Sequence, residues 1–263
     1  MARTALLNVM VNAALKAGRG LARDFGEVEN LQVSVKGPGD FVSAADKRAE
    51  EVIIGELAKA RPTYSVLAEE SGTTEGSDTS HRWIIDPLDG TTNFLHGIPL
   101  FAISIGLERE GVMVAGVIYN PIMNELFVAE RGAGAFLNDR RLRAARRSDP
   151  TTFVIGTGMP QLHRPGQDEY LGELRAVIRN VAAVRRLGSA ATDLAWTAAG
   201  RYDGYWQHMV SPWDVAAGIV IAREAGVIVT DASGGDTMLD GGGVVAGNET
   251  VHRQLLGFLS EPS

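Results

Sequence analysis

The sequence contains no cysteine among its 263 residues, and this absence excludes several kinds of protein. Without thiols the chain has no disulfide framework, no thiolate nucleophile, no cysteine-ligated zinc and no iron–sulfur cluster. A reducing compartment fits this composition, so we expect a cytoplasmic protein. Hydrophobic residues make up 45% and charged residues 22% of the chain, which is typical of a globular protein with a sizeable core.

Positive charge is also scarce. Lys and Arg number 25 against 32 Asp and Glu, a formal net charge of −7 that repels phosphodiester backbones. We therefore expect no direct DNA binding. The single basic cluster consists of Arg140, Arg141, Arg143, Arg146 and Arg147. We interpret it as a solvated strand and loop, and a surface for a protein partner is the alternative.

Long apolar runs are absent too. In residues 1–24, Asn8, Asn12 and Lys16 interrupt the apolar positions, and no run approaches the ~18 residues needed to span a bilayer. We interpret this segment as an amphipathic helix that associates with no membrane. Its apolar stripe recurs at helical spacing: Leu6, Met10, Ala13, Ala17 and Leu21.

Several motifs for phosphate binding and nucleophilic catalysis are missing. No Gly-x-x-x-x-Gly-Lys-Ser/Thr loop occurs, and the pairs Gly132-x-Gly134 and Gly156-x-Gly158 lack the third glycine of a dinucleotide fingerprint. The five histidines form no metal-binding pair at helical spacing, and there is no Gly-x-Ser-x-Gly elbow. Nucleotide-binding loops, zinc chemistry and a nucleophilic serine are therefore excluded.

Strand and helix signals organise the chain into two parts. The N-terminal part, residues 1–149, is predicted to contain the first helix, a second helix capped by Ser43 and stopped by Pro62, and an antiparallel meander over residues 101–137. The C-terminal part, residues 150–263, alternates strands and helices. We expect the two parts to form one compact catalytic unit.

Two segments of the N-terminal part carry turn signals. Residues 31–35 are predicted to form a short strand, which the sequence Gly-Pro-Gly at 37–39 breaks. Residues 71–80, rich in Gly, Ser and Thr, are predicted to form a surface loop. This loop separates two strands, residues 64–68 and 82–85, and each of these strands ends in acidic residues.

The densest chemistry lies in residues 83–93, Trp-Ile-Ile-Asp-Pro-Leu-Asp-Gly-Thr-Thr-Asn. An apolar strand delivers Asp86 and Asp89 into a turn, and two carboxylates with the carbonyl of Leu88 suit Mg²⁺, which prefers oxygen ligands. The Gly-Thr pair that follows opens a short helix whose free N–H groups can receive a phosphate. The alternative is a purely structural turn, because Asp-Pro and Asp-Gly are common turn sequences.

Three further acids bear on this motif. Glu69 and Glu70 close the preceding strand, and because side chains alternate along a strand we expect only one of them to face the side of Asp86. A solvated strand end explains the pair equally well. Asp214 follows Ser211 at a helix start, where a capping box alone explains it, although the apolar helix places this acid at the rim of the core.

Several separate segments resemble the signatures of the inositol monophosphatase family. They are Ala-Glu-Glu-Ser at 68–71, Asp-Pro-Leu-Asp-Gly-Thr-Thr-Asn-Phe at 86–94 and Pro-Trp-Asp-Val-Ala-Ala-Gly at 212–218, and residues 40–46 and 185–191 extend the likeness. The chain most resembles the bacterial extragenic suppressor branch. The resemblance implies an α+β fold, a layered α-β-α-β-α sandwich of the inositol monophosphatase and fructose-1,6-bisphosphatase type, often as a homodimer.

The resemblance also implies Mg²⁺-dependent, lithium-sensitive hydrolysis of a small phosphate monoester, inositol 1-phosphate above all, with two to three metal ions per site. One metal would be bound by Glu69 rather than Glu70, by Asp86 and by the Leu88 carbonyl, and a second by Asp86, Asp89 and Asp214. Glu69 would also face a third, weaker site. Asp46 and the hydroxyl of Thr91 would orient the metal-bound water, and Glu69 is expected to be the third catalytic residue.

The family suggests a substrate-binding surface as well. The N–H groups of Gly90 and Thr91, next to Thr92, would hold the phosphate. The residues expected around the alcohol are Gly188, Ser189, Ala190, Gln207 and Asp214. An ordinary capped helix explains the stretch from Gly188 equally well. At Gln207 many family members carry a glutamate that accepts from a cyclitol or sugar hydroxyl, so the alcohol stays open.

Two alternatives follow from the resemblance. Relatives also act on sugar bisphosphates such as fructose bisphosphate, on histidinol phosphate, on nucleotide 3′-phosphates or on NADP. Bacterial relatives serve in transcription complexes, so RNA polymerase or antitermination factors are candidate partners in a second hypothesis, in which catalysis is secondary.

Overall fold

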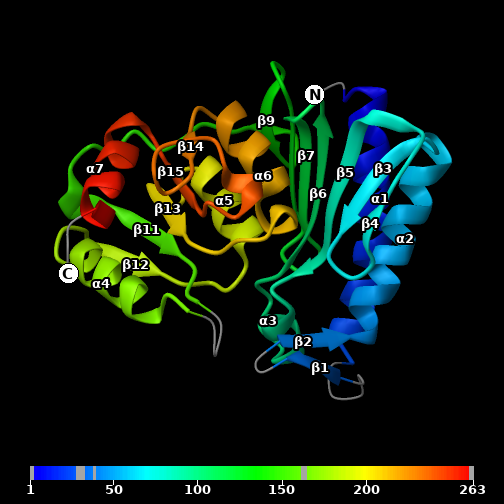
Figure 1. Cartoon of the computed structure of the whole chain (residues 1–263), viewed down its shortest axis with the longest axis horizontal. Coiled ribbons are helices and arrows are strands. Elements are labelled where there is room, and N and C mark those ends of the chain that lie inside the picture. The colour runs from blue at the N-terminus through cyan, green and yellow to red at the C-terminus, as the bar shows by residue number, and fades with distance from the viewer. Residues whose placement is uncertain (1–2, 28–32, 38–39, 161–164, 261–263) are drawn as a thin grey trace.

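The computed structural model describes residues 3–27, 33–37, 40–160 and 165–260. Over these ranges the chain forms seven α-helices and two large sheets, which are stacked in layers (Figure 1). From right to left in Figure 1 the layers are a helix pair, an eight-stranded sheet, a second helix pair, a five-stranded sheet and a third helix pair. The predicted α+β class and its α-β-α-β-α order are confirmed.

The two predicted N-terminal helices form the first layer. α1 (Ala5–Phe25) begins after Thr4, whose hydroxyl accepts a hydrogen bond from the Leu7 N–H at 3.2 Å. α2 (Ala44–Ala60) ends before Pro62, as predicted. Of the predicted stripe, Leu6 is half-buried, and the other members are buried in the core: Met10, Ala13, Ala17 and Leu21. No helix in the described ranges combines the length and apolar composition needed to cross a bilayer.

The eight-stranded sheet covers these helices with one face. Its strand order is β10-β9-β8-β7-β6-β5-β3-β4, and neighbours are antiparallel except for the parallel pair β3 and β5. The predicted meander forms β6 to β9. The strands are β3 (Tyr64–Ala68), β4 (Gly72–Thr74), β5 (Asp78–Asp89), β6 (Ala102–Arg109), β7 (Val112–Asn120), β8 (Glu125–Glu130), β9 (Gly134–Leu137) and β10 (Arg140–Arg141).

The prediction of a surface loop over residues 71–80 is wrong. β4 pairs antiparallel with β3, with Thr74 opposite Val66, and β5 already begins at Asp78. Gly72, with a φ of 74°, allows the tight turn from β3 into β4. The segment is polar because β4 is a short strand at the sheet edge, where one face is solvated, and its composition therefore resembles a loop.

A separate hairpin precedes α2. β1 (Val33–Gly37) pairs antiparallel with β2 (Asp40–Ser43). The predicted strand over residues 31–35 overlaps β1, but residues 31 and 32 and the predicted break at Pro38 and Gly39 lie outside the described residues.

The C-terminal part alternates strands and helices as predicted. The five-stranded sheet has the order β12-β11-β13-β15-β14. Its strands are β11 (Val154–Thr157), β12 (Ala183–Arg185), β13 (Gly204–Gln207), β14 (Ile228–Thr230) and β15 (Val244–Gly247). The outer helices are α4 (Gln167–Ile178) and α7 (Glu249–Ser260), and the helices between the two sheets are α5 (Ala190–Ala198) and α6 (Pro212–Glu224).

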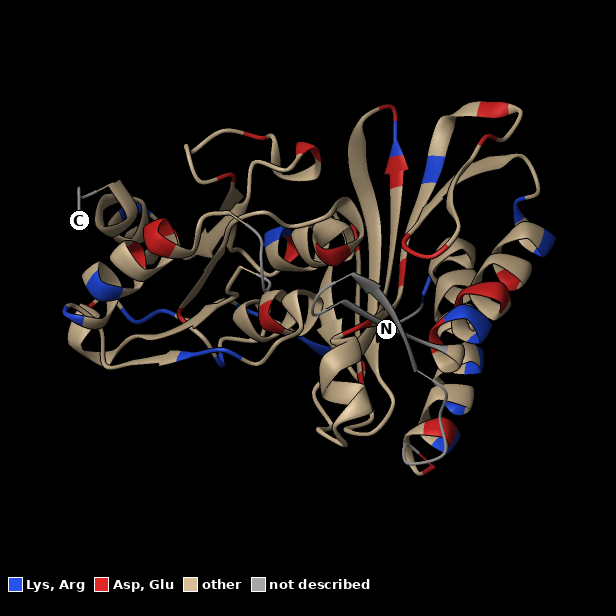
Figure 2. Cartoon of the chain, turned by 60° about the horizontal axis from the view of Figure 1, so that its bottom comes forward, with Lys and Arg blue, Asp and Glu red and all other residues tan. Residues whose placement is uncertain are grey.

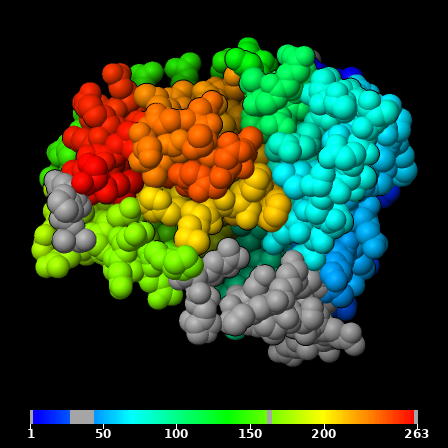
Figure 3. All heavy atoms as spheres, viewed as in Figure 1, coloured from blue at the N-terminus to red at the C-terminus, as the bar shows by residue number. Residues whose placement is uncertain are grey.

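The backbone of α6 lies directly on the large sheet. A Cβ atom added to Gly116 of β7 would stand 2.5 Å from the Ala217 carbonyl oxygen, so this approach requires glycine. Most of α6 is buried between the two sheets. The close packing brings the first turn of α6, with Asp214, to the end of β5. In Figure 3 the cyan surface of the N-terminal part and the yellow and orange surface of the C-terminal part form one continuous boundary.

Charged residues lie mainly on the outside of the layers. Figure 2 shows basic and acidic residues interspersed along the outer helices on its right-hand side. The five arginines of the basic cluster are exposed, and the first two form β10 at the edge of the large sheet. Arg147 donates to the buried carboxylate of Asp203 and so links this segment to the start of β13.

Candidate active site

The parallel strands β3 and β5 bring acids to one edge of the large sheet. Ala68 lies opposite Ile85, so the residues that follow, Glu69 and Asp86, emerge side by side. The Glu69 N–H donates to the Ile85 carbonyl at 3.1 Å and keeps the two segments together at this point. The carboxyl ends of parallel strands are a general location for binding sites.

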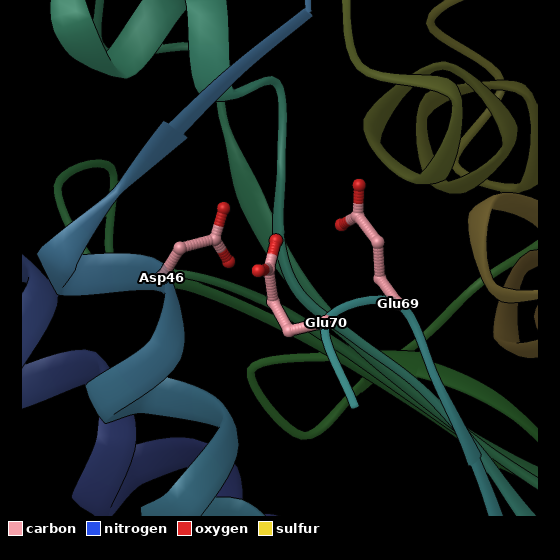
Figure 4. A group of neighbouring side chains, drawn as sticks. All are labelled: Asp46, Glu69 and Glu70. Atoms are coloured by element: carbon pink, nitrogen blue, oxygen red, sulfur yellow. The ribbon is translucent and has the colours of Figure 1, made fainter. Parts of the chain in front are cut away.

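Both glutamates after β3 reach an acidic cluster with Asp46, but only Glu69 lines the same pocket as Asp86, in agreement with the expectation that one of the two faces the side of Asp86. β3 ends at Ala68, so Glu69 and Glu70 lie in a turn. One carboxylate oxygen each from Asp46, Glu69 and Glu70 lie within 4.8 Å of one another, and Figure 4 shows the three side chains grouped beside the start of α2. Because alternation holds only for extended backbone, this turn lets both side chains approach Asp46 as well.

The turn that carries these glutamates is held by Glu50 of α2. Its Oε2 accepts from the Glu70 N–H and its Oε1 from the Ser71 N–H, both at 2.9 Å. Glu50 is only 4% exposed, so both bonds are shielded from water. Glu50 lies one helical turn after Asp46, on the same face of α2. One helix therefore supplies an acid of the cluster and fixes the position of the others.

The end of β5 has an irregular backbone that turns two carboxylates toward one space. The pairing of β5 with β6 shifts register between Asp86 and Asp89. Asp86 Oδ1 accepts from the Leu88 N–H at 2.9 Å. Asp89 Oδ2 accepts from the Ser189 hydroxyl at 2.6 Å and from the Ala191 N–H at 2.7 Å, which ties the motif to the first turn of α5.

Gly90 and Thr91 follow at the start of the short helix α3 (Thr91–Leu95). Gly90 has a φ of 97°, and a Cβ atom there would stand 3.0 Å from the Leu100 carbonyl oxygen. The Thr91 hydroxyl lies 3.1 Å from the Leu88 carbonyl oxygen and 3.5 Å from Asp46 Oδ2. Because a hydroxyl has one proton, these bonds are alternatives, and the bond to Leu88 has the better geometry.

Asp214 lies at the first turn of α6. The capping box is present, with the Ser211 N–H donating to Asp214 Oδ2 at 2.8 Å. The same carboxylate lines the pocket together with Glu69, Asp86 and Asp89. The structural and the functional interpretations of this acid are therefore compatible, because one oxygen caps the helix and the carboxylate still faces the other acids.

The acids strongly disfavour one another's ionisation. Burial, followed by the charges of Glu69, Asp89 and Asp214, raises the pKa of Asp86 well above its usual range. Burial and the charge of Asp89 likewise raise the pKa of Asp214. Burial raises the pKa of Asp89 to about 6, although hydrogen bonds from Ser189 and α5 oppose the shift.

These shifts and the donor set fit a divalent cation. Carboxylates that are poorly solvated and repel one another are stabilised when a cation is placed among them. The groups that converge are carboxylate and carbonyl oxygens, the ligands that Mg²⁺ prefers. The residues present are therefore suited to hold Mg²⁺.

A pocket of about 330 Å³ joins the acids to the C-terminal part. Among the residues predicted for the site, Asp46 alone does not line it; Asp46 is 1% exposed and lies behind Thr91. The predicted residues that line the pocket are Glu69, Asp86, Leu88, Asp89, Gly90, Thr91, Thr92, Gly188, Ser189, Ala190, Gln207 and Asp214.

Sequence reasoning missed several residues of this region. Gly158, Met159, Pro160, Arg186 and Asp193 also line the pocket. The position of Glu50, four residues after Asp46 on a helix, was a signal for its role in the site. Nothing in the sequence signalled Gly158 to Pro160, because their approach depends on the packing of β11 against β13.

Comparisons with known proteins agree on one family. The sequence model of the inositol monophosphatase family matches residues 2–261. An inositol-1-monophosphatase of Mesorhizobium japonicum is 63% identical over 262 residues, which cover 100% of this chain and 98% of the relative. The Nus factor SuhB of Escherichia coli is 43% identical over 251 residues, covering 95% of this chain and 94% of the relative.

Solved structures agree with this family. The crystal structure of the extragenic suppressor protein suhB from Bartonella henselae superposes with a TM-score of 0.96 at 56% identity, covering 99% of this chain and 100% of that chain. An inositol monophosphatase from Anabaena superposes with a TM-score of 0.84 at 36% identity, covering 97% and 94%. This chain therefore belongs to the inositol monophosphatase family and is a phosphoric monoester hydrolase.

Proposed function

We propose that the chain hydrolyses small phosphate monoesters, inositol 1-phosphate among them, by attack of water in the presence of Mg²⁺. The observation that carries the proposal is the convergence of Glu69, Asp86, Asp89 and Asp214 from three separate segments on one pocket. Relatives named inositol-1-monophosphatase, 51–63% identical, support the same substrate class.

The same acids are the proposed metal ligands. Glu69, Asp86 and the Leu88 carbonyl would hold one ion; Asp86, Asp89 and Asp214 would hold a second; Glu69 faces a third, weaker site. When bound, Mg²⁺ would supply Lewis-acid polarisation of the phosphate and a more acidic water. Asp86, shared between the two main sets, is held in place by its bond from the Leu88 N–H.

The remaining groups orient the reactants. The N–H groups of Gly90 and Thr91 would hold phosphate oxygens at the first turn of α3. Asp46 and the Thr91 hydroxyl would align the attacking water, and Thr91 would turn its proton from the Leu88 carbonyl toward Asp46 as it does so. The phosphoryl group would then pass directly to water with no covalent link to the protein, while its bond to the alcohol oxygen breaks and the alcohol leaves with a proton that comes from the water.

A panel of phosphate monoesters with Mg²⁺ tests the proposal. We expect release of inorganic phosphate from inositol 1-phosphate, and comparison with fructose bisphosphate, histidinol phosphate and nucleotide 3′-phosphates ranks the alcohols. Failure to release phosphate from any of these esters, by folded protein at saturating Mg²⁺, would overturn the proposed function.

Three finer properties complete the proposal. They are inhibition by millimolar lithium, assembly as a homodimer and location in the cytoplasm. Lithium titration of phosphate release checks the first property, sedimentation equilibrium the second and cell fractionation the third. An activity indifferent to lithium or a monomer at all concentrations would contradict the corresponding property without touching hydrolysis itself.

A second function is favoured by one set of relatives. Proteins named Nus factor SuhB are 42–43% identical over almost the whole chain. The exposed arginines of the basic cluster, on β10 and the segment after it, offer a cationic surface away from the pocket lining. We propose RNA polymerase or an antitermination factor as the partner. Retained binding by a charge-reversed Arg140→Glu, Arg143→Glu double variant would contradict this surface.

A further inference from the structure

The leaving-group end of the pocket contains a buried tyrosine and a glutamine on the same strand. Tyr205 and Gln207 lie two residues apart on β13 and therefore point to the same side of the sheet. Gln207 lines the pocket, whereas Tyr205 is fully buried beneath it. The Tyr205 hydroxyl donates a hydrogen bond to Gln207 Oε1.

This bond fixes which end of the amide faces the pocket. The Tyr205 hydroxyl has one proton, and among the described residues Gln207 Oε1 is its acceptor. A reversed amide would leave that proton buried without an acceptor, which is costly. Burial raises the pKa of Tyr205 well above its usual range, so the hydroxyl keeps its proton.

The backbone of Gly158 encloses the same oxygen from another side. A Cβ atom added to Gly158 would stand 1.8 Å from Gln207 Oε1, so the oxygen lies against the Gly158 Cα. The Tyr205 hydroxyl and the Gly158 backbone therefore occupy two sides of Oε1. The group that Gln207 can offer to a ligand is its Nε2 amide, which carries two N–H donors.

A cation lines the same end. Arg186 is exposed and is the one basic residue among the described residues that line the pocket. The nearby acid, Asp193, is 1% exposed and lies deeper in α5. This end therefore offers a ligand the N–H donors of Gln207 and one exposed positive charge, while its acid is buried.

We infer that the leaving-group end selects an alcohol that bears an oxyanion, a carboxylate or a second phosphate, and that Tyr205 is the positioning residue that holds Gln207 as a donor. The inference rests on the proposed phosphatase function and narrows its substrate class. Inositol 1-phosphate, whose alcohol offers only hydroxyl groups, then remains a substrate but not the preferred one.

A glutamate at position 207 offers a matched test. It has the shape of glutamine, would accept from Tyr205 with one oxygen, and would present its other oxygen to the pocket as a charged acceptor. Gln207→Glu therefore exchanges donor for acceptor with little change of volume. Hydrogen bonds to charged groups are stronger than neutral ones, so the exchange should alter selection by about 10-fold or more.

The experiment compares esters that differ by one group at equal free Mg²⁺. The carboxylate pair is 2-phosphoglycerate against glycerol 2-phosphate, and the phosphate pair is fructose 1,6-bisphosphate against fructose 1-phosphate. We expect kcat/KM to favour the oxyanion member about 10-fold or more. A preference within one pair alone identifies the oxyanion of that pair as the group that the pocket recognises. No preference within either pair overturns the inference.

Variants separate positioning from structural effects. Gln207→Glu should abolish the preference and raise kcat/KM for inositol 1-phosphate about 3- to 30-fold. Tyr205→Phe should reduce the ratio of the two kcat/KM values within each pair, because the Gln207 amide can then rotate and present its oxygen to the pocket. Arg186→Gln should also reduce it, whereas the neighbouring Arg185→Gln, outside the pocket lining, should not.

The outcomes distinguish this inference from the proposed function. Equal shifts for all esters in Gln207→Glu would mean that the residue acts on the acids or on stability, and would overturn the inference. If no ester is hydrolysed, the proposed function fails. Binding of glycerate and of glycerol, measured by ligand-observed NMR, then tests the inference independently of hydrolysis. Weaker binding of glycerate to Gln207→Glu supports it, and equal binding to both proteins contradicts it.

Discussion

The two ends of the pocket are built in different ways. At the acid end, the carboxylates follow core strands or begin buried helices, and hydrogen bonds hold Asp86, Asp89 and Asp214 in place. At the leaving-group end, Arg186 and Met159 are exposed, and Met159 presents 49% of its surface to solvent. From this contrast we expect the fold to fix the hydrolytic chemistry and a few replaceable side chains to decide which alcohol is accepted.

Ser189 joins the two ends. Its hydroxyl donates to Asp89 Oδ2, while its backbone begins α5 beside the leaving-group residues. A substitution that changes only hydrolysis, or only the selection of the alcohol, therefore assigns its residue to one end of the pocket. A substitution that changes both assigns its residue to the region where the two ends meet.

The largest effect is expected at the acid end. Asp89→Asn keeps the shape of the side chain but removes a ligand charge, so phosphate release should fall by ~10³-fold or more for every ester. Circular dichroism should show an unchanged fold. Activity near that of the wild type would contradict the role of Asp89 and would weaken the distinction between the acid end and the leaving-group end of the pocket.

Substitution of the two residues that would orient the attacking water, Asp46 and Thr91, should cause a smaller loss of activity. Thr91→Ala and Asp46→Asn should each lower kcat by ~10²-fold, and the double variant little further, since both act on one water. Steady-state kinetics of the four proteins check this. Losses that multiply would show that the two residues act independently, which the alternative bond from Thr91 to Leu88 would then explain.

Substitution of Glu50 should reduce activity less than substitution of Asp46 or Thr91. Glu50→Gln replaces one acceptor oxygen by a donor opposite the Glu70 and Ser71 N–H groups, so the turn with Glu69 loses a bond. We expect ~10-fold weaker Mg²⁺ activation with a nearly unchanged kcat at saturating Mg²⁺. Glu51→Gln, at an exposed neighbouring position, is the control and should change neither value.

The smallest effect concerns stability against pH after chelation of divalent cations. The raised pKa of Asp89, about 6, means that the folded protein holds a proton that the unfolded chain loses near its ordinary value of 3.8. The contribution of Asp89 to stability should therefore be lost as pH rises from 4 to 6, so the Tm of the wild type should fall relative to that of Asp89→Asn. We expect a relative decrease in Tm of about 4–8 °C, the shift that ~2 kcal/mol produces in a chain of this size.

Two comparisons check this pH dependence. Asp89→Asn should flatten the curve of Tm against pH, and excess Mg²⁺ should raise the Tm of the wild type most at the higher pH. A chelated wild type whose Tm changes with pH in the same way as that of Asp89→Asn would contradict the raised pKa of Asp89.

The sequence predicted the acid end better than the rest because its residues are contiguous in short segments. Residue spacing located the Asp86 to Asp89 motif and the helix start at Asp214, although it left a structural explanation open for both and only the family resemblance implied their roles. The convergence of Glu70, the support from Glu50 and the approach of Gly158 to Gln207 depend on how distant elements pack, and spacing within one element does not contain this information. The loop predicted at 71–80 failed for a related reason, since pairing with β3 converts polar sequence into strand.

The central claim is that the acids of one end hydrolyse phosphate monoesters through a bound divalent cation. The most direct measurement is the release of inorganic phosphate from inositol 1-phosphate by the purified protein with Mg²⁺, with excess chelator, and after Mg²⁺ is restored. The account predicts turnover, its loss and its recovery in that order. Undiminished release in excess chelator, or no release by folded protein at saturating Mg²⁺, would contradict it.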